Sequence, residues 1–172
     1  MALILTSGAA AAEPGVSLQL AQQRAQSLAA LEYQLELQVP EERSAPIEGK
    51  MTISFNYCAD GQALQIDFRQ TPENLSTVSV NGQPVDYQQT QEHILLPANS
   101  LRGGANQVVL AFLAGDSSLN RNEDYLYTLF VPDRARTAFP LFDQPDLKSR
   151  ISLSLVLPPG WTALANAALL HK

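Results

Sequence analysis

Few side chains in this sequence are of the types that carry out catalysis or bind metals. The chain has only two histidines, His93 and His171, which lie far apart in the sequence. A zinc pair of the His-x-x-x-His type and a site of three histidines are therefore excluded. The sequence contains no Gly-x-Ser-x-Gly elbow, no Walker loop and no Gly-x-Gly-x-x-Gly loop. The residues alone thus predict no catalytic residue and no metal ligand, and we expect His93 to be either exposed or a hydrogen-bonded structural histidine.

The excess of acidic over basic side chains argues against two classes of binding partner. The 172 residues include 17 Asp and Glu against 11 Lys and Arg, which gives a formal net charge of −6. Proteins that bind nucleic acids or anionic membranes need clustered basic side chains, so we expect neither partner. The length is that of one domain with a core of its own. The single cysteine, Cys58, cannot form an internal disulfide bond.

Residues 1–14, MALILTSGAAAAEP, combine a short apolar run with small residues. We expect either a disordered end or the remnant of a secretory signal, because Ala9 to Ala12 fits an Ala-x-Ala cleavage pattern while the basic start of a signal peptide is missing. The first interpretation is compatible with the cytoplasm and the second implies export, and the sequence leaves the localisation open. No other segment is long and apolar enough to predict a membrane span.

The rest of the chain is predicted to form one helix followed by strands. Residues 16–31 have apolar residues at helical spacing from Leu18 to Leu28, and Ser17 is placed to cap the helix start. From Tyr33 onward apolar and polar residues alternate, which is typical of strands with one buried face. Asn81-Gly82 predicts a tight hairpin turn. The predicted strands cover 33–39, 47–57, 64–68, 78–80, 85–87, 93–96, 107–114, 151–157 and 161–166.

This pattern predicts an all-β fold, an antiparallel β-sandwich or saddle-shaped pair of sheets with about eight strands and one short N-terminal helix. The segment 125–130 is apolar on both faces, so we expect it to be buried on both sides. It leads into a stretch rich in aromatic residues, prolines and opposite charges. Such a composition predicts an ordered loop fixed by arginine–carboxylate bonds, and we expect an ion pair between Arg136 and Asp143.

This loop carries the most specific motif of the sequence. Ala135-Arg136 is followed by Phe139-Pro140-x-Phe142-Asp143-Gln144-Pro145-Asp146-x-Lys148. The stretch resembles the signature of the aminopeptidase N family of zinc metallopeptidases, the gluzincin aminopeptidases. The resemblance implies that residues 15–172 form the amino-terminal β domain of that family. It also implies a structural or interface role for the signature loop residues Arg136, Phe139, Pro140, Phe142, Asp143, Gln144 and Pro145.

The family's catalytic groups belong to a different domain. Its zinc ligands, a His-Glu-x-x-His motif and a later glutamate, and its Gly-x-Met-Glu-Asn substrate loop lie in the domain that follows, and neither motif occurs in this chain. The resemblance therefore implies no cofactor for this chain and zinc for a catalytic domain missing from it. It implies two partners, the parent's own catalytic domain and its peptide substrate. We expect an excised amino-terminal domain or a naturally short relative that is not an enzyme by itself.

Two positions depart from the family. After the position of Thr128, relatives carry polar side chains that face the α-amine of the substrate, whereas this chain has Leu129 and Val131. Neither of these side chains offers a hydrogen-bond acceptor. We therefore expect Leu129 and Val131 to form an apolar wall of the substrate cleft in the parent enzyme. The alternative function is a stand-alone β-sandwich that binds or scaffolds a protein or carbohydrate partner.

Overall fold

The computed structural model describes residues 12–171 and consists mainly of strands, with one α-helix, α1 (Leu18–Ser27), near the start. Its strands are β1 (Leu28–Gln38), β2 (Glu48–Tyr57), β3 (Leu64–Asp67), β4 (Leu75–Val80), β5 (Gln83–Pro84), β6 (Gln88–Thr90), β7 (His93–Leu96), β8 (Gly104–Leu113), β9 (Leu119–Arg121), β10 (Leu126–Thr128) and β11 (Arg150–Val156). Short 3₁₀ helices, η1 (Pro72–Asn74), η2 (Ala98–Ser100), η3 (Asp116–Ser118) and η4 (Ala135–Thr137), lie between strands. The prediction of an all-β fold with one short helix is confirmed, and the strands outnumber the expected eight because several have only two to four residues.

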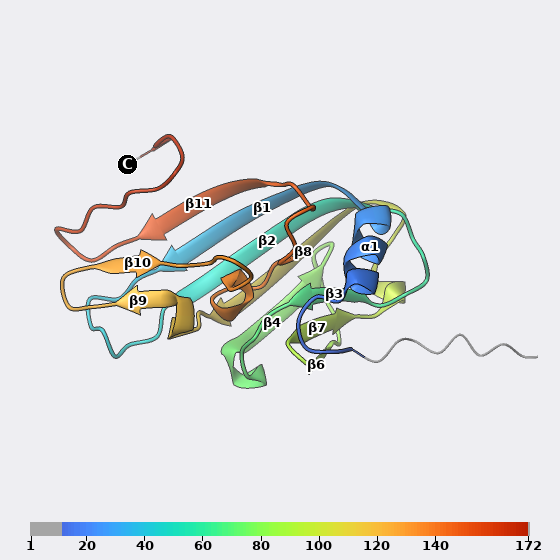
Figure 1. The fold of residues 1–172 in the computed structure, drawn as a ribbon, viewed down its shortest axis with the longest axis horizontal. Helices are drawn as coiled ribbons and strands as arrows, with labels where there is room; N and C mark the ends of the chain where they lie inside the picture. Colours follow the sequence, from blue (N-terminus) through green and yellow to red (C-terminus); the bar gives the residue numbers. More distant parts are fainter. Residues whose placement is uncertain (1–11, 172) are drawn as a thin grey trace, which may run out of the picture.

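The strands form three sheets (Figure 1). The large sheet has the order β11-β1-β2-β8-β4-β5, the second sheet has the order β3-β7-β6, and β10 pairs with β9 alone. The pairings between these strands are antiparallel except that of β1 with β11, which is parallel and sets Tyr33 beside Ile151. In Figure 1 the second sheet and α1 lie toward one end of the large sheet, and β9 and β10 lie toward the other.

The core joins one face of the large sheet to the second sheet. Side chains alternate between the two faces of a strand, so the registers align buried apolar residues across β1, β2, β8 and β4. Phe68, just after β3, meets Phe112 of β8 edge-on, with ring centroids 5.7 Å apart. Gly49 lies opposite Phe112, and a side chain there would collide with that ring, because a Cβ would lie 2.4 Å from it. The fully buried members of this core include Ile47, Met51, Ile53, Ile66, Ile94, Leu96, Val108 and Leu110.

The helix is shorter than predicted. It starts as expected, with the hydroxyl of Ser17 accepting a hydrogen bond from the Leu20 N–H at 3.2 Å. It ends at Ser27, however, and the chain from Leu28 to residue 31 belongs to β1, where Leu28 pairs with Tyr57. The prediction was wrong because apolar residues at positions 28 and 31 fit the period of a helix as well as they fit an irregular strand. Their burial is achieved instead by an irregular strand start, with a register shift between positions 29 and 32.

The face by which α1 contacts the core also differs from the prediction. Leu18, expected on the buried face, is 75% exposed, whereas Arg24 and Ser27 are buried. The guanidinium of Arg24 pairs with the carboxylate of Asp67 in β3. A buried ion pair, rather than an apolar stripe, therefore holds α1 in place.

Three further predictions concern the hairpin at Asn81-Gly82, the last expected strand and the N-terminal end. The turn at Asn81-Gly82 joins β4 to β5 with φ values of 52° and 80°, as predicted. The second strand of the hairpin is Gln83–Pro84, however, so the strand expected over 85–87 is wrong. The strand expected over 161–166 is wrong: these residues have no neighbouring strand, and Trp161 is half-buried rather than in the core. Of the end predicted at 1–14, residues 1–11 lie outside the described residues. No helix within 12–171 has the length and apolar character needed to cross a membrane.

Candidate functional site

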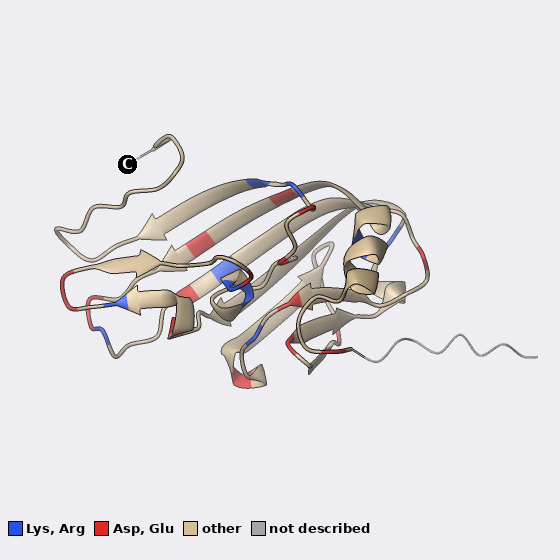
Figure 2. Cartoon of the chain, viewed as in Figure 1, with Lys and Arg blue, Asp and Glu red and all other residues tan. Residues whose placement is uncertain are grey.

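The segment around β10 presents apolar side chains to solvent. Every second residue from Tyr125 to Val131 is exposed, from 48% for Leu129 to 77% for Val131. The rings of Tyr125 and Tyr127 stack, with centroids 6.4 Å apart and an interplanar angle of 21°. β10 itself contains no charged residue (Figure 2). We call Tyr125, Tyr127, Leu129 and Val131 the exposed strip.

The prediction that residues 125–130 are buried on both sides is therefore wrong. β10 pairs only with β9, in a two-stranded sheet of three residues per strand, so little of the chain is available to cover its second face. Leu126 and Phe130 are the residues that pack on the core, and the Phe130 ring meets that of Phe139 edge-on at 5.2 Å. The two residues predicted as a cleft wall, Leu129 and Val131, lie on the surface. The two tyrosines beside them were missed.

Arg136 fixes the loop that follows the exposed strip. Its side chain is 8% exposed and contacts three carboxylates, Asp133 at 3.1 Å, Glu92 at 3.2 Å and Asp143 at 3.4 Å. The backbone N–H of Arg136 also donates to Asp143 at 3.1 Å. Burial opposes the charge, but the hydrogen bonds to Asp133 and Glu92 raise the pKa of Arg136. The predicted ion pair between Arg136 and Asp143 is present, as one part of a larger network.

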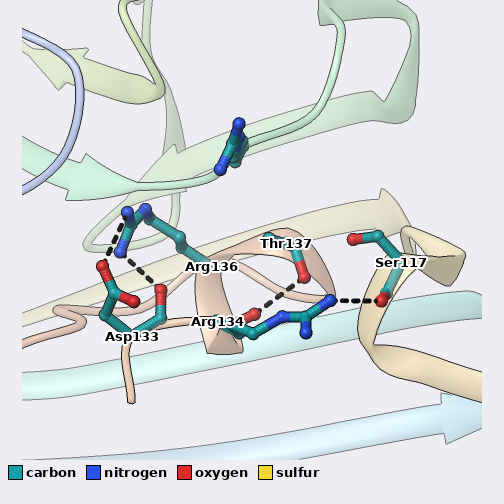
Figure 3. A pocket seen from close by; sticks show the side chains of 6 residues that line it. Ser117, Asp133, Arg134, Arg136 and Thr137 are labelled. Atoms are coloured by element: carbon teal, nitrogen blue, oxygen red, sulfur yellow. Dashed lines mark hydrogen bonds and ion pairs between the residues drawn. The ribbon is translucent and has the colours of Figure 1, made fainter. Parts of the chain in front are cut away.

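Arg136 lines a hollow of about 430 Å³ together with Arg69, Arg134 and three other residues (Figure 3). In Figure 3 the Arg136 side chain points to Asp133, and that of Arg134 points to Ser117, whose carbonyl oxygen accepts at 2.7 Å. Arg69 contacts Glu92 at 3.0 Å. Arg69 and Arg136 are thus paired with the carboxylates of the network, whereas Arg134 donates to a backbone carbonyl. The residues that line the hollow include neither histidine nor cysteine, and its hydroxyl groups are those of Ser117 and Thr137.

A buried carboxylate beneath the loop was missed by the sequence analysis. Asp67, expected to face outward on an alternating strand, is fully buried. It accepts hydrogen bonds from both Nη atoms of Arg24 and, at 2.7 Å, from the Asp143 N–H. Burial acts to raise the pKa of Asp67, but the contacts with His93 and Arg24 outweigh it and lower that pKa. One carboxylate therefore connects α1, β3, β7 and the loop.

His93 is fully buried in β7, which confirms the expectation of a structural histidine over that of an exposed one. Its Nδ1 lies 2.8 Å from Oδ1 of Asp67, an ion-pair distance, although the contact is off the ideal hydrogen-bond direction. Its Nε2 lies 2.9 Å from the carbonyl oxygen of Glu13 and 3.0 Å from that of Gly15. The ring thereby connects the segment before α1 to the buried carboxylate.

Further contacts hold the signature loop against the large sheet and α1. The Phe142 N–H donates to the hydroxyl of Tyr33 at 3.0 Å, and burial raises the pKa of that tyrosine. The Gln144 amide donates to the Ala21 carbonyl at 3.1 Å. The guanidinium of Arg24 lies over the Phe142 ring, 5.3 Å from its centroid. Of the seven loop residues singled out in the sequence, the structure buries Arg136, Phe139, Pro140, Phe142 and Gln144, half-buries Asp143 and exposes Pro145.

The described residues do not form a metal centre. Within 12–171 no group of three or more His, Cys, Asp and Glu side chains is arranged to hold a metal ion. The polar atoms of Asp67 and His93 face Arg24, the loop backbone and main-chain carbonyls instead. A zinc ion needs three or four free ligand atoms around it, so the pair does not fit that ion.

Comparison with known proteins identifies the family to which this fold belongs. Residues 29–171 match the family model described as the Peptidase M1 N-terminal domain. Aminopeptidase N from Streptomyces lividans is 30% identical over 168 residues, which is 90% of this chain and 19% of that protein. A probable M1 family aminopeptidase from Encephalitozoon cuniculi is 35% identical over 80 residues, 42% of this chain and 9% of that protein. The chain thus spans less than a fifth of the length of these relatives.

Solved structures show the same fold. An M1 zinc metallopeptidase from Deinococcus radiodurans superposes with a TM-score of 0.59 at 19% identity, over 75% of this chain and 32% of that one. Native leukotriene A4 hydrolase from Saccharomyces cerevisiae gives a TM-score of 0.62 at 21% identity, over 76% of this chain and 23% of that one. Because the family match covers most of the sequence, the chain belongs to the Peptidase M1 N-terminal domain family.

Proposed function

We propose that this chain is the non-catalytic amino-terminal domain of a zinc-dependent aminopeptidase-like peptidase, and that it packs on the catalytic domain and walls the active-site cleft for short peptides. The observation that carries the proposal is the exposed strip, an uncovered apolar surface that continues into a tightly anchored loop. The zinc of the parent enzyme would polarise the scissile carbonyl and activate water in the catalytic domain. The residues of this chain would confine and orient the substrate.

The outer strand of the large sheet supports packing against a further domain. Ile151 and Leu153, which lie on one face of β11, are both about half exposed. Ile151 continues the row of Tyr33 in β1, which is buried, so the apolar face of the sheet extends beyond the layer that covers it. Contiguous exposed apolar surface of this kind marks interaction sites. We therefore assign the β11 end of the sheet to contact with the catalytic domain.

The strip supports the role of a cleft wall. The backbone of Leu129 is fixed by a hydrogen bond from its N–H to the Ser118 carbonyl at 3.1 Å, and the turn after it by one from Arg134 to Phe130 at 2.8 Å. The strip can therefore present a defined surface. Since Leu129 and Val131 offer no acceptor to an ammonium group, this wall would contact the first substrate residue through apolar atoms.

The test uses the full-length protein that contains this domain. Leu129→Gln with Val131→Glu should raise the ratio of kcat/KM for free-amine peptides to kcat/KM for amino-blocked peptides, about tenfold for each 1.4 kcal/mol of new interaction. Leu18→Gln changes an equally exposed apolar residue on α1 and serves as the control. A ratio that stays constant in the double variant, with folding intact, would show that the strip does not face the amine.

A second measurement concerns the chain by itself. Purified without a metal-affinity tag, residues 1–172 should bind no stoichiometric zinc and hydrolyse no aminoacyl reporter, with or without added zinc. Metal-dependent turnover retained across independent preparations would contradict the non-catalytic assignment. A downstream sequence that lacks His-Glu-x-x-His would instead favour a binding or scaffold module.

A further inference from the structure

The outer edge of β10 carries backbone groups that bond to no other strand. Tyr125 and Leu129 both bond to the chain around β9, the Tyr125 carbonyl as acceptor at 2.8 Å and the Leu129 N–H as donor at 3.1 Å. Bonded and non-bonded pairs alternate along an antiparallel ladder, so the backbone groups of Leu126 and Thr128 point away from β9. Among residues 12–171, neither the N–H nor the carbonyl of these two residues takes part in a hydrogen bond. Thr128 is exposed, so this edge offers donors and acceptors to solvent.

The side chains beside this edge have the spacing of an extended peptide. The exposed strip presents a side chain at every second residue, and the stacked rings of Tyr125 and Tyr127 have centroids 6.4 Å apart. Side chains on one face of an antiparallel strand recur at about 6.8 Å, twice the rise of about 3.4 Å per residue. An extended peptide that lies along β10 can therefore bring one side chain to each ring.

We propose that β10 binds peptides by strand addition, and that Tyr125 and Tyr127 contact peptide side chains beyond the first residue. In this mode of recognition, backbone hydrogen bonds hold an extended peptide to a free sheet edge, and its alternate side chains provide specificity. The inference rests on the function proposed above, in which Leu129 and Val131 contact the first substrate residue. It adds the occupant of the edge and a role for the two tyrosines.

The place of the first substrate residue determines the direction of the added strand. A peptide that begins beside Leu129 and Val131 runs back toward Tyr125, which makes it antiparallel to β10. In an antiparallel pair, the peptide residues opposite Leu126 and Thr128 exchange hydrogen bonds with them, and those opposite the tyrosines form the non-bonded pairs. Side chains of non-bonded pairs lie closer together, with Cα atoms about 4.5 Å apart. The tyrosines thus favour aromatic or β-branched side chains, since such cross-strand pairs are stabilising.

Two N-methylated peptides test the backbone pairing on the 172-residue chain. The parent probe is a capped seven-residue peptide in which glutamine and valine alternate, and the valines are expected to face the tyrosines. N-methylation of the two inner glutamines removes N–H groups that face β10 and should weaken binding about tenfold or more, because two hydrogen bonds are lost. N-methylation of two valines removes N–H groups that point away from β10 and should change Kd less than about twofold. Equal loss or equal retention of binding in the two peptides would overturn the inference.

Amide signals of the ¹⁵N-labelled chain locate the bound peptide. We expect the N–H signals of Leu126 and Thr128 to shift most, since they gain acceptors, and that of Tyr127, which faces β9, to shift less. Thr128→Pro removes one donor from the free edge and leaves the ladder with β9 intact, so it should weaken binding about fivefold. Thr128→Val keeps the N–H and is the matched control. If Thr128→Pro fails to fold, the two methylated peptides decide alone.

Failure of the strand addition and failure of the cleft wall give different results. The expected contrast between the methylated peptides, together with an unchanged substrate ratio in Leu129→Gln with Val131→Glu, would support the strand addition and reject the wall. A changed ratio without that contrast would retain the wall and reject the strand addition. A parent peptide that binds the 172-residue chain but not the full-length protein would mean that the catalytic domain covers the edge of β10, which also overturns the inference.

Discussion

Replacing Asp67 with asparagine should destabilise this domain severely. Asp67→Asn preserves the shape of the side chain but removes its charge and sets an NH₂ group among donors. Arg24, itself buried, would lose its counter-ion, and the Asp143 N–H would compete for a single remaining oxygen. Removing one partner of a buried ion pair costs about 3–5 kcal/mol. A typical domain has about 5–15 kcal/mol of stability in total, so this variant approaches the limit of folding.

Substitutions of two less buried carboxylates provide a comparison for the cost of Asp67→Asn. Asp143→Ala removes an acceptor from a half-buried position and should cost about 1–3 kcal/mol, because the Arg136 N–H loses its partner. Glu36→Gln breaks a pair with Lys50 in which both side chains are about half exposed, and should cost at most about 0.5 kcal/mol. The three variants alter one carboxylate each and differ in burial, so burial alone should rank them.

Urea unfolding followed by far-UV circular dichroism measures the three changes, provided that the slope of the transition stays constant. Combining Asp67→Asn with Arg24→Met should cost less than the sum of the single changes, by about 1 kcal/mol or more, because the orphaned charge is removed. The reasoning is refuted if the midpoint for Asp67→Asn moves no further than that for Glu36→Gln.

Three further variants or conditions test other contacts. Tyr33→Phe should cost about 1–3 kcal/mol, because the Phe142 N–H loses its buried acceptor; an unchanged Tm would show that another group takes over. Gly49→Ala should cost about 1–3 kcal/mol in urea unfolding, because its Cβ would lie 2.4 Å from the Phe112 ring, and a neutral effect would mean that the ring moves freely. The stability that Asp67 contributes should be present above about pH 4, near its unfolded pKa, and be lost as the pH falls through its lowered folded pKa. Acid titration of the wild type should therefore show a loss that Asp67→Asn lacks, and equal acid sensitivity in both would contradict this assignment.

The strands were predictable because alternation is a local signal. The sequence around Tyr33 and Leu35, for example, carries its burial pattern in the residue order itself. The end of α1 was not predictable, since apolar residues at 28 and 31 satisfy both periods and only the pairing of Leu28 with Tyr57 decides between them. Local alternation likewise predicted that the side chain of Asp67 faces solvent, whereas it is fully buried in the structure.

The candidate site was predictable only where a motif described it. The loop from Arg136 to Asp143 could be recognised as ordered from its residue types. The partner of Asp67 is Arg24, 43 residues away, and no short-range pattern links the two. The exposure of Tyr127 depends on how few strands flank β10, which is a property of the sheet and not of the segment.

The parallel pairing of β1 with β11 has a consequence for the order in which the domain assembles during synthesis. β1 leaves the ribosome early, whereas its outer neighbour starts at Arg150, so the edge of β1 stays unpaired until nearly all of the domain has been made. Such distant pairings slow folding, and unpaired edges invite association with other chains. Glu32 and Glu36, which lie along β1 with exposed side chains, carry the like charge that discourages this association. In the folded domain Glu32 and Glu36 are surface residues. During synthesis their like charges would reduce the tendency of the unpaired β1 to associate with another chain.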